Sequence, residues 1–199
     1  MRILLFLLNL LRAGFWCCLL FALDRAYLAV LTLLALLWHE VFHMLALLHL
    51  SRSARMRSRL NGLRLLPSGI LSYREERFVA AAGPLGGLLG ALLCLPLYPL
   101  APDYLPDFAL CHLLTSLSNL LPIEGYDGYR ILKSTLLLHE ARSASTVTNA
   151  VSFALSALLA LLSLFLLGLI GEGLWPTVTF LFALIGSLPD RKNTILEDL

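Results

Sequence analysis

Residues 27–50 read YLAVLTLLALLWHEVFHMLALLHL, an apolar run with the motif His39-Glu40-Val41-Phe42-His43 near its end. The run is long enough for a transmembrane helix, which needs about 20 mainly apolar residues. On such a helix the two imidazoles of an HExxH motif lie one turn apart on the same face. That spacing suits one Zn²⁺ ion, and it places Glu40 as a general base beside the metal. The run therefore predicts metal-dependent hydrolysis inside a membrane.

The composition of the whole chain is that of an integral membrane protein. Of the 199 residues, 59% are hydrophobic and 14% are charged, whereas soluble domains contain about 25% charged residues. The formal net charge of +2 indicates no nucleic-acid partner, so the surroundings that we expect are the lipid bilayer. The four cysteines lie in apolar stretches without a CxxC pair, and we interpret them as small buried hydrophobic residues.

Further apolar segments predict an all-α polytopic fold with about six transmembrane helices in one domain, residues 1–199. The expected spans are 3–22, 27–50, 78–97, 108–132, 147–170 and 175–188. The small residues of the sequence AAGPLGG, residues 81–87, predict close packing of the third span against its neighbours.

The positions of the basic residues predict the orientation of these spans. With a cytoplasmic N-terminus and six spans, nearly all of the 15 Lys and Arg residues fall on the cytoplasmic side, with Arg12 and Arg25 as the exceptions. Both termini are therefore expected to be cytoplasmic. The HExxH motif then lies in the cytoplasmic half of the second span, so a third metal ligand at the same depth should come late in the fourth span.

The end of the fourth span contains such a candidate. Residues 119–128 read NLLPIEGYDG, in which Asp127 offers a carboxylate at membrane depth. Acidic residues at this depth cost about 2.5–3.5 kcal/mol on insertion scales and are usually functional. Two His and one carboxylate leave a fourth zinc position open for water. Pro122, Gly125 and Gly128 are expected to loosen the helix here, which is tolerated where the backbone lines a cavity.

Together, HExxH and NxxPxxxxDG resemble the two motifs of the site-2 protease family of intramembrane zinc metalloproteases. The order and spacing are most similar to the bacterial stage IV sporulation protein FB branch, and the resemblance covers about residues 28–133. It implies a catalytic core of three helices, with a short membrane-associated β-like hairpin between the second and third spans. Neither a PDZ nor a CBS domain is expected.

The resemblance also implies roles for individual residues. His39, His43 and Asp127 would bind one Zn²⁺ per chain, Glu40 would be the catalytic acid/base, and Asn119 would hold substrate or the oxyanion. Two positions depart from the family pattern. Phe42 stands where a small residue is usual, which predicts a crowded helix contact. Gly87 replaces an Asn that often follows the Gly-Pro pair.

Structural alternatives remain for each of these residues. The His–Glu cluster could join helices without a metal, although buried unpaired polar groups are costly. Asp127 could be a helix-end carboxylate paired with Arg130, and Asn119 could make an interhelical hydrogen bond.

The expected function is regulated intramembrane proteolysis of a membrane-tethered protein in a bacterial cell membrane. The substrate would be a sigma-factor precursor or an anti-sigma factor, and membrane regulatory proteins would be further partners. The alternatives are a membrane metal transporter that uses His39, His43 and Asp127 as a transit site, and an inactive scaffold. Transporters often contain internal repeats, which this sequence lacks.

Overall fold

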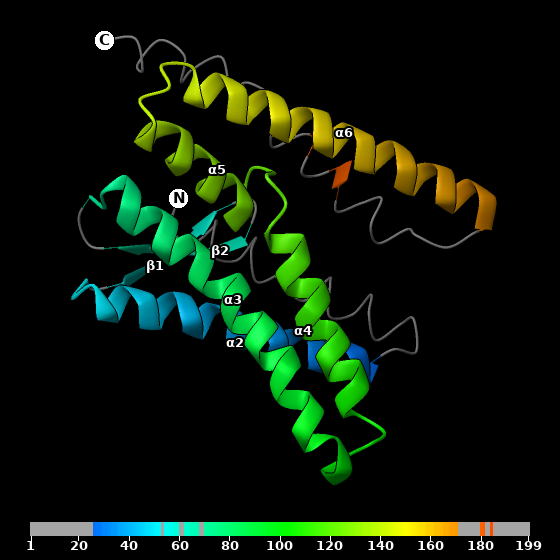
Figure 1. Ribbon diagram of the computed structural model, residues 1–199. Coiled ribbons are helices and arrows are strands. Elements are labelled where there is room, and N and C mark those ends of the chain that lie inside the picture. Colours follow the sequence, from blue (N-terminus) through cyan, green and yellow to red (C-terminus); the bar gives the residue numbers. More distant parts are fainter. Residues whose placement is uncertain are drawn as a thin grey trace.

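The computed structural model describes residues 26–52, 54–59, 62–67, 70–170, 180–181 and 184. Its elements are α2 (Ala26–His49), β1 (Ala54–Arg59), β2 (Gly62–Pro67), α3 (Tyr73–Leu97), the short 3₁₀ helix η1 (Tyr98–Leu100), α4 (Leu105–Asn119), α5 (Asp127–Leu138) and α6 (Ala144–Ile170) (Figure 1). The expected span 3–22 and most of 175–188 lie outside the described residues, so the number of six spans stays a prediction.

Three helices form the centre of the described structure. The helices α2, α3 and α4 contact one another pairwise, α5 packs on α3, and α6 packs on α5 (Figure 1). Because α2, α4 and α5 all pack against α3, this helix determines how the parts of the site meet.

Glycines on α3 allow this close packing. A Cβ atom at Gly83 or Gly86 would overlap side chains of α2, and one at Gly87 or Gly90 would overlap side chains of α4. Gly83 and Gly86 are three residues apart, as are Gly87 and Gly90, so each pair lies along one side of the helix. The small residues that predict close packing therefore lie at the contacts with both neighbouring helices.

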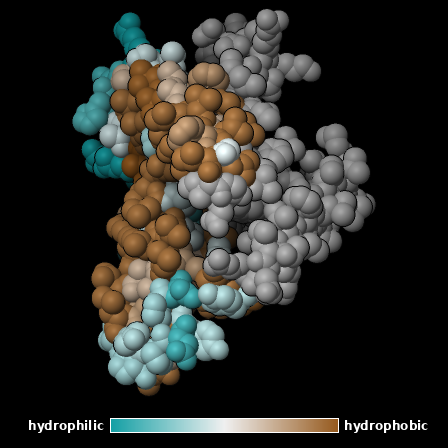
Figure 2. Space-filling view, turned by 90° about the vertical axis from the view of Figure 1, so that its right-hand side faces the viewer, coloured by the Kyte–Doolittle hydropathy of each residue, from teal (hydrophilic) through white to brown (hydrophobic). Residues whose placement is uncertain are grey.

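The described helices carry the surface expected of a membrane protein. Three segments, Val30–His49, Tyr73–Leu100 and Ala144–Leu169, are long and apolar enough to cross a bilayer. Many large hydrophobic side chains on these helices are exposed, including Leu37, Leu85 and Leu161. In Figure 2 hydrophobic residues form a broad band between polar residues gathered at the two ends of the described part. A bilayer would cover such a band.

An antiparallel pair of strands connects α2 to α3. Residues of β1 and β2 pair from Ala54 with Pro67 to Arg59 with Gly62. This pair lies in the segment for which the sequence predicts a β-like hairpin, and its association with the membrane stays a prediction. The following helix, α3, begins with a capping box in which Ser72 and Glu75 exchange hydrogen bonds with each other's backbone N–H groups.

The expected single span over residues 108–132 is wrong in one respect, because the chain forms two helices there. The helix α4 ends at Asn119 and α5 begins at Asp127. Gly125 has a φ of 104°, a conformation that favours glycine. A Cβ atom at Gly128 would overlap the backbone carbonyl of Leu120. The residues expected to loosen the helix thus end it, and after the turn α5 packs against α3.

Candidate metal centre

The first part of the centre comes from α2, which presents two buried histidines. The exposed fractions of His39 and His43 are 2% and 5%. Their ring centroids are 4.7 Å apart with an interplanar angle of 82°, and their Nε2 atoms are separated by 3.1 Å. The helical spacing of four residues thus brings one nitrogen of each ring to the same point.

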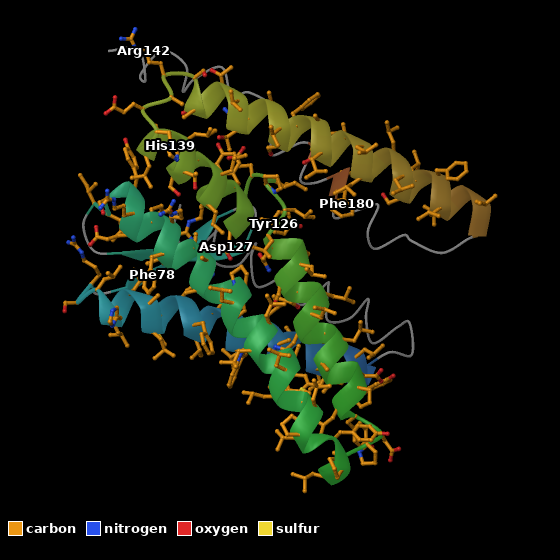
Figure 3. All side chains as sticks on the ribbon, viewed as in Figure 1. Phe78, Tyr126, Asp127, His139, Arg142 and Phe180 are labelled. Atoms are coloured by element: carbon orange, nitrogen blue, oxygen red, sulfur yellow. The ribbon has the colours of Figure 1, made fainter. Side chains whose placement is uncertain are left out.

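The helix α5 brings a carboxylate to that point. Asp127 is the first residue of α5 and lies where α5 meets α3 and the end of α4 (Figure 3). Its Oδ2 atom lies 3.0 Å from Nε2 of His39 and 3.0 Å from Nε2 of His43. The three buried residues form a group whose ligand atoms are close enough to hold one metal ion.

The hydrogen bond of His43 favours a cation at this point. Nδ1 of His43 lies 2.7 Å from the carbonyl oxygen of Val79 and therefore donates its hydrogen there. In the neutral ring, Nε2 then carries a lone pair that faces the ionised Oδ2 of Asp127. Two lone-pair atoms at 3.0 Å repel each other, and a cation between them, either a proton or a metal ion, would remove this repulsion. The donor set therefore fits a metal ion.

The backbone of α3 closes one side of the centre at Gly83. A Cβ atom at this position would lie 2.5 Å from Nε2 of His39 and 2.6 Å from Cε1 of His43. These distances are shorter than ordinary van der Waals contacts. The absence of a side chain at residue 83 thus leaves the two ligand nitrogens their space.

Arg130 holds the other oxygen of Asp127. Its Nη1 donates to Oδ1 of Asp127 at 3.1 Å, and its Nε donates to Oε1 of Glu76 at 2.7 Å. Asp127 therefore takes part in both of the arrangements that the sequence left open, since Oδ2 faces the histidines while Oδ1 pairs with Arg130.

The two remaining predicted site residues are Glu40, which adjoins the group in the chain, and Asn119, which precedes Asp127 by eight residues. Glu40 is half-buried and follows His39 directly on α2. Asn119 is half-buried at the last position of α4, and its Nδ2 donates to the carbonyl oxygen of Thr115 at 2.9 Å. Because Nδ2 carries two hydrogens, one of them remains for another acceptor.

The two unusual positions, Phe42 and Gly87, each lie at a close contact between helices. Phe42 packs at Gly86, where a Cβ atom would overlap its ring, so a glycine provides the space that a large side chain at residue 42 needs. The expected crowding is thereby avoided. At Gly87 a Cβ atom would overlap Oγ of Ser116.

Sequence reasoning missed three features of the centre: the Val79 carbonyl that orients His43, the open space at Gly83, and Glu76. Gly83 lies in the AAGPLGG segment, whose small residues predict helix packing but do not indicate the space beside the histidines. Neither Val79 nor Glu76 belongs to a recognisable motif.

Neither the models of known protein families nor the curated protein sequences contain a match to this chain. Among solved structures, the chain is similar to a site-2 protease from Methanocaldococcus jannaschii, with 21% sequence identity and a TM-score of 0.62. The similarity covers 92% of this chain and 86% of the other. A His-His-Asp group able to hold a metal therefore lies in a chain that has the fold of a site-2 protease.

Proposed function

We propose that the chain is an intramembrane zinc metalloendopeptidase of the site-2 protease family. The observation that carries this proposal is the convergence of His39, His43 and Asp127, with 3.0–3.1 Å between their ligand atoms, in a site-2 protease fold. Similarity of fold alone does not determine function, so the proposal depends on the chemistry of these residues.

Zinc is the metal that this set of donors suits. Two imidazoles and one carboxylate are the protein ligands of many hydrolytic zinc sites, which keep a further position for water. We infer one zinc ion per chain. Bound there, it would supply Lewis-acid chemistry that makes water nucleophilic near neutral pH.

Glu40 is the proposed general base. In an HExxH helix the residue after the first ligand lies beside the metal position. Its carboxylate would accept a proton from the attacking water and deliver it to the amine that leaves when the peptide bond breaks.

Asn119 is the proposed donor to the oxyanion. The hydrogen of Nδ2 that Thr115 does not accept would bond to the developing negative charge on the substrate carbonyl oxygen. The bond to Thr115 would hold the amide in place before the substrate arrives. Replacing Asn119 by Ala should therefore lower the rate of cleavage more than it lowers zinc affinity.

The β1–β2 pair is the proposed substrate-binding edge. A transmembrane helix must unwind before its carbonyl groups can be attacked, because they are bonded within the helix. An unwound segment could pair with a free strand edge. Ile70, which follows β2, is 94% exposed and offers an apolar contact beside this edge.

Proline substitutions test this role of the strands. Leu65→Pro or Ile70→Pro should reduce cleavage and leave zinc bound, because proline removes a backbone N–H group. Leu65→Ala is the matched control, since it shortens the side chain and keeps the N–H group. Cleavage that is unchanged in both proline variants would contradict strand pairing.

The proposed substrate is a membrane-tethered protein, either a sigma-factor precursor or an anti-sigma factor. We place the enzyme in a bacterial cell membrane with both termini in the cytoplasm, as the basic residues predict. Membrane regulatory proteins would be its further partners.

The central experiment co-expresses a model membrane-tethered substrate with the wild-type chain or with Glu40→Gln, and measures zinc in the same purified samples. Cleavage by the wild type alone, with zinc in both, is the expected result. Glu140→Gln is the control, because Glu140 is exposed and follows a His that has no second ligand four residues later. It should cleave like the wild type.

Two outcomes would contradict the proposal. Equal cleavage by wild type and Glu40→Gln would remove Glu40 from the mechanism. Zinc uptake into vesicles by both proteins, without cleavage of any substrate, would favour the metal transporter.

A further inference from the structure

Asp127 has its two carboxylate oxygens in different environments. Oδ2 faces the two histidines at 3.0 Å, and Oδ1 accepts a hydrogen bond from Arg130 at 3.1 Å. The side chain of Asp127 is 9% exposed, so little water is available to replace the bond to Arg130. A carboxylate held in this way presents one oxygen to a metal and keeps the other away from it.

Arg130 is held in turn by Glu76. The Nε–Oε1 distance of 2.7 Å is shorter than the bond from Arg130 to Asp127, and the Arg130 side chain is 19% exposed. Glu76 belongs to α3, whereas Arg130 and Asp127 belong to α5. The contact therefore joins α5 to the helix that packs against the histidines.

The planar guanidinium group is what allows one side chain to serve both carboxylates. Its Nε and Nη1 hydrogens point in fixed directions, whereas the ammonium group of Lys is a compact charge on a flexible stem. Without Arg130, Oδ1 of Asp127 would lose the hydrogen bond that holds it, and the carboxylate could rotate.

We propose that Arg130, braced by Glu76, is a positioning residue that makes Asp127 a one-oxygen metal ligand. This inference rests on the proposed zinc function. A second oxygen on the metal would fill the position that a catalytic zinc keeps for water. Partners that orient the ligands of a metal commonly change its affinity by 10–100-fold when they are replaced.

The test uses the full-length chain in detergent and measures zinc affinity by competition with a chromophoric chelator. Arg130→Gln should weaken zinc binding by about 10–100-fold. Glu76→Gln should weaken it less, and the double variant should be no weaker than Arg130→Gln, because Glu76 acts through Arg130. Arg130→Lys should restore only part of the affinity.

The control is Arg52→Gln. It breaks another pair between an arginine and a glutamate of α3, the 3.3 Å contact of Arg52 with Glu75, which does not involve Asp127. Zinc affinity should stay at the wild-type value in this variant.

A cobalt spectrum provides a readout that a merely structural role would not change. With Co²⁺ in place of zinc, wild type should show the strong visible absorption of a four-coordinate site. Arg130→Gln should show the weaker absorption of a higher coordination number, because Oδ1 becomes free to bind.

Wild-type zinc affinity and an unchanged cobalt spectrum in Arg130→Gln would overturn the inference. Equal weakening of zinc binding in Arg52→Gln would also overturn it, because the effect would then not be specific to Arg130. Losses of zinc affinity that add up in the double variant would exclude the proposed role of Glu76 in holding Arg130. These outcomes leave the proposed protease intact, whereas a wild-type chain that binds no zinc would overturn both proposals.

Discussion

Adding one methyl group at residue 83 should remove metal binding while leaving a folded protein. In Gly83→Ala, the new Cβ atom would lie 2.5 Å from Nε2 of His39 and 2.6 Å from Cε1 of His43. Ordinary contact begins at 3.4 Å, so the His39 ring would have to move by about 0.9 Å. His43 cannot move freely, because its Nδ1 is bonded to the carbonyl of Val79.

This displacement is large compared with what a zinc site tolerates. Ligand distances must agree with the ideal values to within about 0.2 Å. Replacing a residue that merely orients a ligand costs about 10–100-fold in affinity, and here a ligand itself moves. We therefore expect zinc affinity to fall by at least about 100-fold, which corresponds to about 2.8 kcal/mol. Overpacking should also reduce the free energy of unfolding by about 1–3 kcal/mol.

Gly90→Ala is the matched control for the steric effect. Its Cβ atom would lie 2.6 Å from Cε1 and 2.7 Å from Nδ1 of His112, another buried histidine ring, two helical turns farther along α3. Zinc affinity by chelator competition and thermal unfolding in detergent should be measured for both variants. Both should lose stability, and only Gly83→Ala should lose zinc. Wild-type zinc affinity in Gly83→Ala, or equal zinc loss in Gly90→Ala, would refute the reasoning.

Three further predictions concern the packing around the centre. Gly86→Ala should lower the unfolding temperature, because its Cβ atom would overlap Phe42, and adding Phe42→Ala should recover part of this loss. Losses of unfolding temperature that add up in the double variant would contradict this contact. Ser152→Ala should reduce the free energy of unfolding by about 1–3 kcal/mol, because Oγ of Ser152 accepts a hydrogen bond at 2.8 Å from the backbone N–H of Glu124. An unchanged unfolding temperature would show that water replaces this hydrogen bond. Gly128→Ala should reduce both stability and zinc content, because its Cβ atom would overlap a backbone carbonyl that cannot rotate away; zinc content equal to wild type would show that the turn before α5 tolerates a side chain.

Local patterns determined much of the site in advance. The spacing of His39 and His43 is a property of one helix, so their convergence follows from the sequence alone. The distribution of basic residues also predicted a third ligand late in the fourth expected span, and the structure brings Asp127 to the two histidines. It did not reveal that α4 ends at Asn119, because Pro122 and Gly125 indicate a loosened helix equally well as a broken one.

The tertiary structure alone decided which side chains surround these ligands. Glu76 reaches Arg130 across 54 positions of sequence, and the carbonyl of Val79 reaches His43 across 36. Such contacts depend on how α3 packs against α2 and α5, and helix packing admits several crossing geometries for the same apolar pattern. The sequence by itself therefore determined that His39 and His43 converge, because their spacing is local to one helix. The packing of three helices decided how Asp127 meets them, what orients the group and what leaves room for a metal ion.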